Sequence, residues 1–392
     1  MSAPPISIFA VLATLAMGMP SATAAEASSP LPARAAAPFT QAASPSTTPA
    51  ASPPSTRAPS PLFSSDRVLE ITIEAPLGDI FRHRGGDRVA YPGRLELTGE
   101  GGGTEVTGLQ DVELRTRGQT RLDKRICPFP PLSLKFRRKD VAGTLFEGQR
   151  RLKVVTHCRD DDDGEQRLLL ESLAYRIYNQ ITDYSFRIRL ARVTWNDTSG
   201  SREPVTRYAF LIEDVSEVAD RTEWIPLSVP AVPPDYVDAD NLVRLEFFQY
   251  LIGNTDWSAF MSDEEATTCC HNTKPVGGPA GPVFVLPYDF DITGLVNPRY
   301  ADRLFRGNLQ SLGLNSVRDR RFRGGCRSEA LWPEVVTEFN ARRDAIEAVV
   351  RDQEGLTART RNEALAYVAG FYDVINDARR LRREIRGHCR TF

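Results

Sequence analysis

Residues 283–294 read VFVLPYDFDITG, an apolar run that leads directly into two carboxylates. The run from Val283 to Pro287 has the length and composition of a buried strand. A carboxylate at the end of such a strand either begins a turn or holds a charged ligand. We favour the second interpretation for Asp289, and Asp291 is a second claimant because it follows only two positions later.

Two polar residues upstream of this strand also favour a site for a charged ligand. The stretch ADNLVRLEFFQYLIGN, residues 239–254, is apolar at helical spacing, and Asp256 follows it directly. Asn272 lies shortly before the strand. Carboxylate and amide oxygens suit Mg²⁺ bound to phosphates, and a separate carboxylate can orient a hydroxyl nucleophile. The alternative for Asp256 is a plain turn residue.

The front half of the chain is rich in predicted strands. Strand-like stretches with alternating apolar residues occur at 67–75, 132–136, 151–158, 187–197 and 207–214. One helix is expected among them, over 165–182, and helices are expected from about 329 onward. A strand-rich front followed by a mostly helical back predicts an α+β fold of two lobes with a cleft between them.

One carboxylate of the helix at 165–182 needs a partner. Glu171 falls in the middle of the apolar arc, where burial is costly unless a cation meets it. Arginine supplies nearly all of the positive charge, so a lysine in an apolar strand needs an explanation. Lys135 in LSLKF is the first candidate partner and Lys153 in RLKVV the second. The alternatives place Glu171 at the edge of the core and Lys135 in solvent.

A basic loop and a histidine are weaker candidates. The loop RTRGQTRLDKR, residues 115–125, contains Gly118 and either contacts phosphates or forms a solvated hairpin. His271 precedes Asn272 and is positioned to order the loop that carries Asn272. The formal net charge of −2 gives no general attraction to nucleic acid or to anionic membranes.

The beginning of the chain resembles an export signal. Residues 1–25 contain an apolar stretch and then small residues, which predicts a signal peptide, with an uncleaved anchor as the alternative. Residues 26–63 are rich in Ala, Pro, Ser and Thr and predict a disordered tether before a domain at 64–392. No later segment is apolar enough to span a bilayer. The expected location is therefore periplasmic or secreted.

Six cysteines agree with export, because disulfides persist in oxidising compartments. They are Cys127, Cys158, Cys269, Cys270, Cys326 and Cys389. Up to three disulfides are expected, but the pairing does not follow from the sequence. We expect the adjacent Cys269 and Cys270 to bond to two different neighbours.

Taken together, these residues resemble the CotH-like kinase family, named for spore coat protein H. The likeness rests on RTRGQT…CPFPPLSLKF, LLLESLAYRIYNQITDYSFRIR, YAFLIEDV, LIGNTDW…HN and VFVLPYDFDITG. It spans about residues 66–310. It implies an atypical protein-kinase-like fold with a strand-rich N-lobe at about 64–222 and a mostly helical C-lobe at about 223–392.

The resemblance also implies a reaction, in which the ATP γ-phosphate passes to a serine or threonine of a protein substrate with Mg²⁺ or Mn²⁺. The implied roles are a catalytic Asp256, a nucleotide site at Lys135, Glu171 and Lys153, and metal ligands at Asp289, Asn272 and Asp291.

The resemblance has one departure from the kinase pattern. Asn272 lies far beyond the spacing of about five residues that separates Asp from Asn in an ordinary kinase catalytic loop. A non-catalytic, pseudokinase-like envelope or surface protein is therefore the alternative function. A kinase for a small molecule or glycan is a third possibility.

Overall fold

The computed structural model describes residues 58–86, 88–100, 108–262, 268–278 and 281–391. All of them belong to one compact unit, Pro53–Phe392. The predicted signal peptide, and the predicted tether as far as residue 57, lie outside the described residues.

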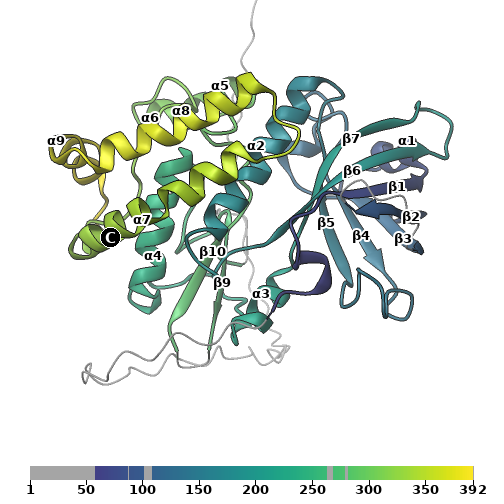
Figure 1. Cartoon of the computed structure of the whole chain (residues 1–392), viewed down its shortest axis with the longest axis horizontal. Coiled ribbons are helices and arrows are strands. Elements are labelled where there is room, and N and C mark those ends of the chain that lie inside the picture. Colours follow the sequence, from purple (N-terminus) through teal and green to yellow (C-terminus); the bar gives the residue numbers. More distant parts are fainter. Residues whose placement is uncertain (1–57, 87, 101–107, 263–267, 279–280, 392) are drawn as a thin grey trace, which may run out of the picture. The chain divides into compact units, whose positions relative to one another are not determined.

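Helices and strands alternate irregularly along this unit (Figure 1). The strands are β1 (Leu69–Ala75), β2 (Tyr91–Glu100), β3 (Gly108–Thr116), β4 (Leu132–Phe136), β5 (Arg151–Val155), β6 (Ile188–Asp197), β7 (Val205–Ile212), β8 (Ile225–Pro226), β9 (Thr273–Gly277) and β10 (Val283–Pro287). The helices are α1 (Leu77–Arg82), α2 (Asp162–Asn179), α3 (Val215–Arg221), α4 (Ala239–Ile252), α5 (Ala301–Leu304), α6 (Arg306–Ser311), α7 (Trp332–Arg351), α8 (Ala358–Ile375) and α9 (Ala378–Arg380).

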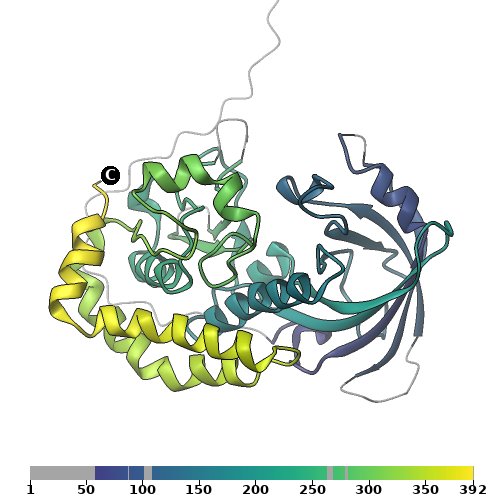
Figure 2. The ribbon, with the colours of Figure 1, turned by 90° about the horizontal axis from the view of Figure 1, so that it is seen from above.

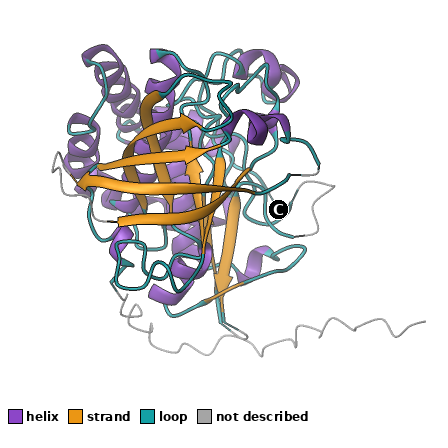
Figure 3. Cartoon of the chain, turned by 90° about the vertical axis from the view of Figure 1, so that its right-hand side faces the viewer, coloured by secondary structure: helices purple, strands orange, loops and turns teal. Residues whose placement is uncertain are grey.

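Seven strands form a closed barrel in the order β1-β2-β3-β4-β5-β7-β6. The strands are drawn in orange in Figure 3. Neighbouring strands are antiparallel, except that β1 and β6 are parallel, with Leu69 opposite Ala191. A ring with an odd number of strands cannot alternate direction throughout, so one parallel pair has to close it. The remaining three strands form a second sheet in the order β10-β9-β8.

Alternate residues of the barrel strands belong to two different cores, because successive side chains of a strand point to opposite faces. Ala209 and Leu211 of β7 lie in the barrel interior. Phe210 lies on the outer face and joins the core around α2. Leu62 and Phe63 are also buried in the interior cluster, so the folded part begins before residue 64.

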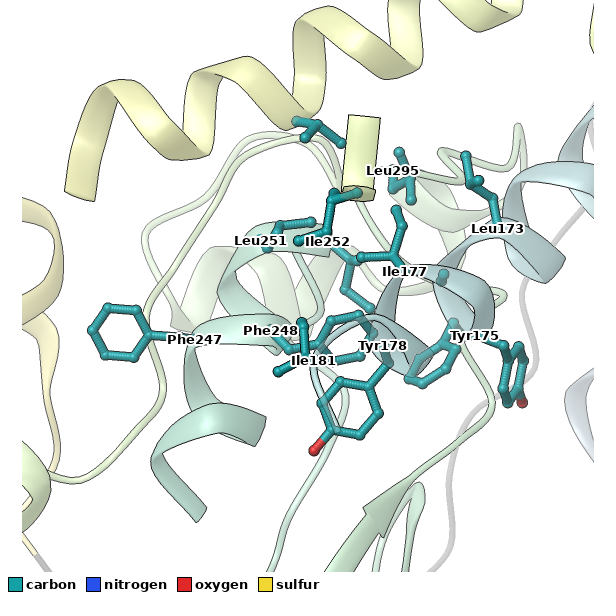
Figure 4. Packing of buried hydrophobic residues seen from close by; sticks show 14 of the residues in the cluster. Leu173, Tyr175, Ile177, Tyr178, Ile181, Phe247, Phe248, Leu251, Ile252 and Leu295 are labelled. Atoms are coloured by element: carbon teal, nitrogen blue, oxygen red, sulfur yellow. The ribbon is translucent and has the colours of Figure 1, made fainter. Parts of the chain in front are cut away.

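Helices cover the outside of β6 and β7 and continue away from the barrel (Figure 2). Helix α2 packs on these two strands and also contacts α7, while α4 packs on β10. The rings of Tyr178 from α2 and Phe248 from α4 are 4.4 Å apart, within a core that also holds Ile177 and Ile252 (Figure 4). Helix α2 therefore joins the barrel to the helical part.

The expected two-lobed kinase-like fold is wrong. The predicted strands and the predicted helix of the front half are present, but the strands close into a barrel. Closure depends on the parallel pairing of β1 with β6, two segments more than a hundred residues apart. Apolar alternation in a single strand contains no information about which distant strand it meets.

Two disulfides link distant parts of the chain. Cys127 bonds to Cys158 and Cys326 to Cys389, with Cα atoms 4.7 and 5.0 Å apart. Cys269 is joined to Cys270, so the expectation of two different partners is wrong. Such bonds are compatible with an oxidising compartment. Across the described ranges, no helix combines the length and the apolar character needed to cross a membrane.

Candidate functional site

A polar cavity of about 390 Å³ lies where several loops meet. Its walls come from the loop Arg117–Arg121 after β3, from residues near Asp256 after α4, from the start of β9, and from the turn after β10. The volume is within the range of about 300–1,000 Å³ typical of small-molecule sites. The predicted Asp256, Asn272, Asp289 and Asp291 all line this cavity.

The turn after β10 turns both of its carboxylates to the cavity. Phe290 is fully buried, and its ring is 4.5 Å from that of Tyr175 on α2. Asp289 and Asp291 line the cavity on either side of it. The backbone N–H of Asp289 donates to the Tyr175 hydroxyl at 2.9 Å. Core packing of Phe290 therefore positions the two carboxylates.

Asn272 and Asp289 share an unusual backbone conformation, with φ of 50° and 61°. They lie at the same end of the paired strands β9 and β10, because the Tyr288 N–H donates to the Asn272 carbonyl at 3.1 Å. Asn and Asp tolerate this left-handed region better than most residues, yet it costs free energy and clusters at functional sites. Asp289 is thus a turn residue and a cavity residue at once.

Arg121 holds three carboxylates together. Its guanidinium donates to both oxygens of Glu171, at 2.9 and 3.1 Å, and contacts Asp289 at 3.2 Å and Asp291 at 3.1 Å. Arg121 and Glu171 are both buried. Glu171 does need a cation, as the helix pattern predicted, but the cation comes from the basic loop. The predicted pairing of Glu171 with Lys135 is therefore wrong.

One guanidinium cannot neutralise three carboxylates. Burial raises the pKa of Asp291 to about 7, and neighbouring Asp289 and Glu171 add to this shift against the attraction of Arg121. Burial likewise raises the pKa of Glu171. The side chain of Asp289 is 39% exposed and that of Asp291 is 13% exposed, so Asp289 is the more accessible of the two to a ligand.

Further cations lie close to Asp289. Burial lowers the pKa of Lys153, with Arg117 and Lys274 among its neighbours and Asp289 attracting it. Burial also lowers the pKa of Lys274, again against the attraction of Asp289. The ammonium of Lys153 is 3.8 Å from Asp214. Arg117 and Lys274 line the cavity together with Asp289, whereas Lys153 lies close to them without lining it.

Lys135 lies outside this group of cations. Its Nζ is 2.7 Å from Glu113, its side chain is 57% exposed, and it does not line the cavity. Ser133, two residues earlier, is opposite Lys153, so both lysines are on the same outer face of the sheet. Two residues of strand correspond to roughly 7 Å, which is enough to carry Lys135 away from the site.

Asp256 is fixed by two neighbours. Its Oδ1 is 2.8 Å from His271 Nε2, and the Asn272 side-chain amide donates to its Oδ2 at 3.2 Å and to its backbone carbonyl at 2.7 Å. The side-chain amide nitrogen of Asn272 is engaged by Asp256, so the side-chain oxygen of Asn272 points away from Asp256. His271 therefore orients Asp256 as well as bordering the loop.

The sequence interpretation missed three cations of the site, Arg117, Arg121 and Lys274. The basic loop was recognised as a whole, but a loop has no periodicity that would single out one arginine. Gly118, with φ of 96°, lets the loop turn between Arg117 and Arg121. Lys274 could have been predicted from the sequence. It is one of only five lysines, and it lies two positions after Asn272, the predicted metal ligand.

The residues present fit a divalent cation with few protein ligands. Within the described part of the chain, no group of three or more His, Cys, Asp or Glu side chains is arranged to hold a metal alone. Asp289 and Asn272 offer hard oxygen donors beside a cluster with excess negative charge. Mg²⁺ is commonly bound through one or two carboxylates together with phosphate oxygens and water.

Comparison with protein-family models gives no match, and comparison with curated proteins gives no similar sequence. The resemblance to the CotH-like kinase family therefore stays a prediction.

Proposed function

We propose that the protein is an exported, metal-dependent phosphotransferase that moves the ATP γ-phosphate to a serine or threonine of a protein acceptor. The observation that carries the proposal is the meeting of Asp256, Asn272 and Asp289 with Lys274 in one cavity. The order of these residues also agrees with the CotH-like resemblance. The disulfides support a periplasmic or secreted location.

The cavity is lined by cations, which can contact phosphates, and by carboxylates, which can hold a metal ion. Arg117 and Lys274 line the cavity and would contact the phosphates, while Lys153, close behind them, would add positive charge. The negative charge of the phosphates would also offset the mutual repulsion of these cations. Asp289 and Asn272 would hold Mg²⁺ or Mn²⁺, which neutralises charge on the transferring phosphate. Glu171 would act through Arg121, which it holds in place.

Asp256 is the residue suited to activate the acceptor. Its carboxylate accepts the proton of the serine or threonine hydroxyl while the hydroxyl oxygen bonds to the γ-phosphorus. The bond from the γ-phosphorus to the bridging oxygen breaks, and ADP leaves with that electron pair. His271 and Asn272 fix the carboxylate, so little reorganisation is needed.

A second candidate function is a non-catalytic envelope or surface protein that binds the same ligand. It is favoured by the contacts of Arg121, which already bridges Asp289 and Asp291 and so competes with a metal ion for their oxygens. Under this alternative, ligand binding would occur without phosphate transfer.

Purified protein incubated with labelled ATP and Mn²⁺ or Mg²⁺, with mixed Ser/Thr proteins as acceptors, tests the proposal. The wild type is expected to transfer label, Asp256→Asn to bind ATP without transfer, and Asp289→Asn to lose both. Lys135→Ala is the matched control and should behave as wild type, because Lys135 does not line the cavity. ATP binding without transfer in the wild type would favour the non-catalytic alternative, and no binding would exclude both.

A further inference from the structure

A second pocket of about 380 Å³ adjoins the cavity through a shared segment of chain. Asp256 lines the first cavity, and the residues that follow it, from Trp257 to Met261, line the second pocket. Residues 231–234 also line the pocket and pair with this segment, because the Val232 N–H donates to the Phe260 carbonyl at 2.9 Å. The two sites therefore share a wall.

The second pocket is apolar but carries positive charge. Arg323 and Arg390 both line it, and burial lowers the pKa of Arg323, with the nearby charge of Arg390 adding to this shift. Among the residues that the structure describes, Arg323 makes no ion pair within 4 Å of a carboxylate, and its guanidinium donates to the Thr255 carbonyl. An apolar pocket with such an arginine favours an anionic ligand.

The carboxyl group of Glu246 offsets this charge only in part, because burial raises its pKa to about 7. It lies in the wall of the pocket and is almost fully buried. Its two oxygens accept hydrogen bonds from the Gly325 N–H at 2.8 Å and from the Ser328 hydroxyl at 2.9 Å. Both carboxyl oxygens of Glu246 therefore already have hydrogen-bond partners within the protein.

Two further residues are suited to contact a ligand. The indole N–H of Trp257 is buried and finds no acceptor in the described part of the protein, which is unusual for a buried donor. Met261 is 65% exposed, the largest exposure among the large apolar side chains that the structure describes as exposed. Methionine adapts readily to different partners.

We propose that this second pocket binds the acceptor protein, through an extended segment in which a large apolar side chain lies next to a carboxylate. The apolar side chain packs on Trp257 and Met261, and the carboxylate meets Arg323. The identity of the occupant rests on the proposed phosphotransferase function. Met261 lines the pocket and is five positions after Asp256, so the two lie at most about 18 Å apart, a span that roughly five residues of extended peptide cover. The anchor therefore lies about two to six residues from the phosphorylated hydroxyl.

Fluorescence anisotropy with short labelled peptides tests this inference without ATP or metal. The probes contain one serine and, two to six residues away on either side, phenylalanine followed by aspartate, in an alanine and glycine background. Matched probes carry lysine in place of the aspartate. The wild type should bind the best acidic probe at least about tenfold more tightly than its lysine counterpart, an effect of about 1.4 kcal/mol.

Three variants locate the binding. Arg323→Gln, which keeps donors for the Thr255 carbonyl, should abolish the preference for the acidic probe. Met261→Ser should weaken both probes about equally, and its exposed position makes misfolding unexpected. Lys135→Ala should match the wild type. Thermal unfolding of each variant checks that the fold is retained.

The inference would be overturned if the wild type bound the acidic and lysine probes equally well, or if it bound neither probe. It would also be overturned if both Arg323→Gln and Met261→Ser left binding unchanged. It would also be overturned if dodecanoate, and no peptide, bound in calorimetric titration, because the occupant would then be a fatty acid. Phosphate transfer without any peptide preference would contradict this inference alone. Peptide binding by this pocket without ATP binding would contradict only the proposed phosphotransferase function.

Discussion

The barrel interior and the cavity beside it are both well buried, but they are stabilised in different ways. The interior is filled by apolar side chains such as Leu134 and Trp195, and its free energy comes from removing apolar surface from water. The wall of the cavity instead buries Arg121 with Glu171 and Asp291, whose burial is costly unless the charges remain paired.

The difference shows that stability and ligand binding can be changed separately in this protein. A substitution inside the barrel should lower the free energy of unfolding and leave the cavity as it is. A substitution of an accessible cavity side chain should change binding and leave stability almost unchanged. Arg121 and Asp291 are exceptions, because both line the cavity and both belong to the buried charge cluster.

Arg121→Met should have the largest effect. It leaves Glu171 and Asp291 buried without their cation, so the free energy of unfolding should fall by about 3–5 kcal/mol in urea titration. Arg125→Met is the matched control in the same loop, because Arg125 is 82% exposed and pairs with Asp123. Its effect should be much smaller, because an exposed ion pair contributes little to stability. Equal effects for the two variants would show that the buried cluster does not contribute as described.

Leu134→Ala should produce the next largest change. Leu134 is fully buried in the barrel interior, so its truncation should lower the free energy of unfolding by about 2–5 kcal/mol. The affinity for ATP with Mg²⁺, measured by calorimetry well below the unfolding temperature, should not change. A parallel loss of affinity would show that the barrel interior and the cavity are coupled.

The pH dependence of stability should reveal the state of Asp291. Its pKa is about 7 in the folded protein and about 4 when unfolded, so the folded state binds more protons between these values. The free energy of unfolding should therefore fall as pH rises from about 4 to 7, by up to about 1.4 kcal/mol per pH unit from this group.

The variant Asp291→Asn isolates that contribution. Glu246, whose pKa burial raises to about 7, does not contact Asp291, so its titration is the same in both proteins and cancels in the difference. The difference in unfolding free energy between wild type and variant should change with pH over this window. A constant difference would mean that Asp291 stays ionised in the folded protein.

The smallest expected effect separates the two lysines of the same barrel face. Lys153→Met should weaken ATP binding about tenfold, because Lys153 lies among the cations beside Asp289. Lys135→Met should leave the affinity unchanged, and the loss of its exposed contact with Glu113 should have little effect on stability. Equal affinities for both variants would remove Lys153 from the site.

The sequence predicted those parts of the site that adjoin regular elements. Asp256 follows a helix, and Asn272 and Asp289 lie beside strands, so each could be placed by the apolar pattern next to it. Lys135 and Lys153 share one face of neighbouring strands, and only the pairing register shows which of them is near the cavity. Arg121 lies in a short turn, where no apolar period exists to fix the direction of a side chain.

The fold was less predictable than the site, because local apolar patterns do not indicate which distant strands pair. The alternation along each strand correctly indicated its buried face, yet the closure of the barrel depends on β1 pairing in parallel with β6. That contact joins segments distant in the sequence, and its register is fixed by packing across the interior.

Calorimetric titration with ATP, with and without Mg²⁺, is the most direct test of the cavity as a metal–nucleotide site. The wild type should bind ATP only when Mg²⁺ is present, and Asp289→Asn should weaken binding by at least about tenfold without a change in unfolding midpoint of more than a few degrees. Absence of ATP binding in Mg²⁺, or equal affinity for wild type and Asp289→Asn, would contradict it.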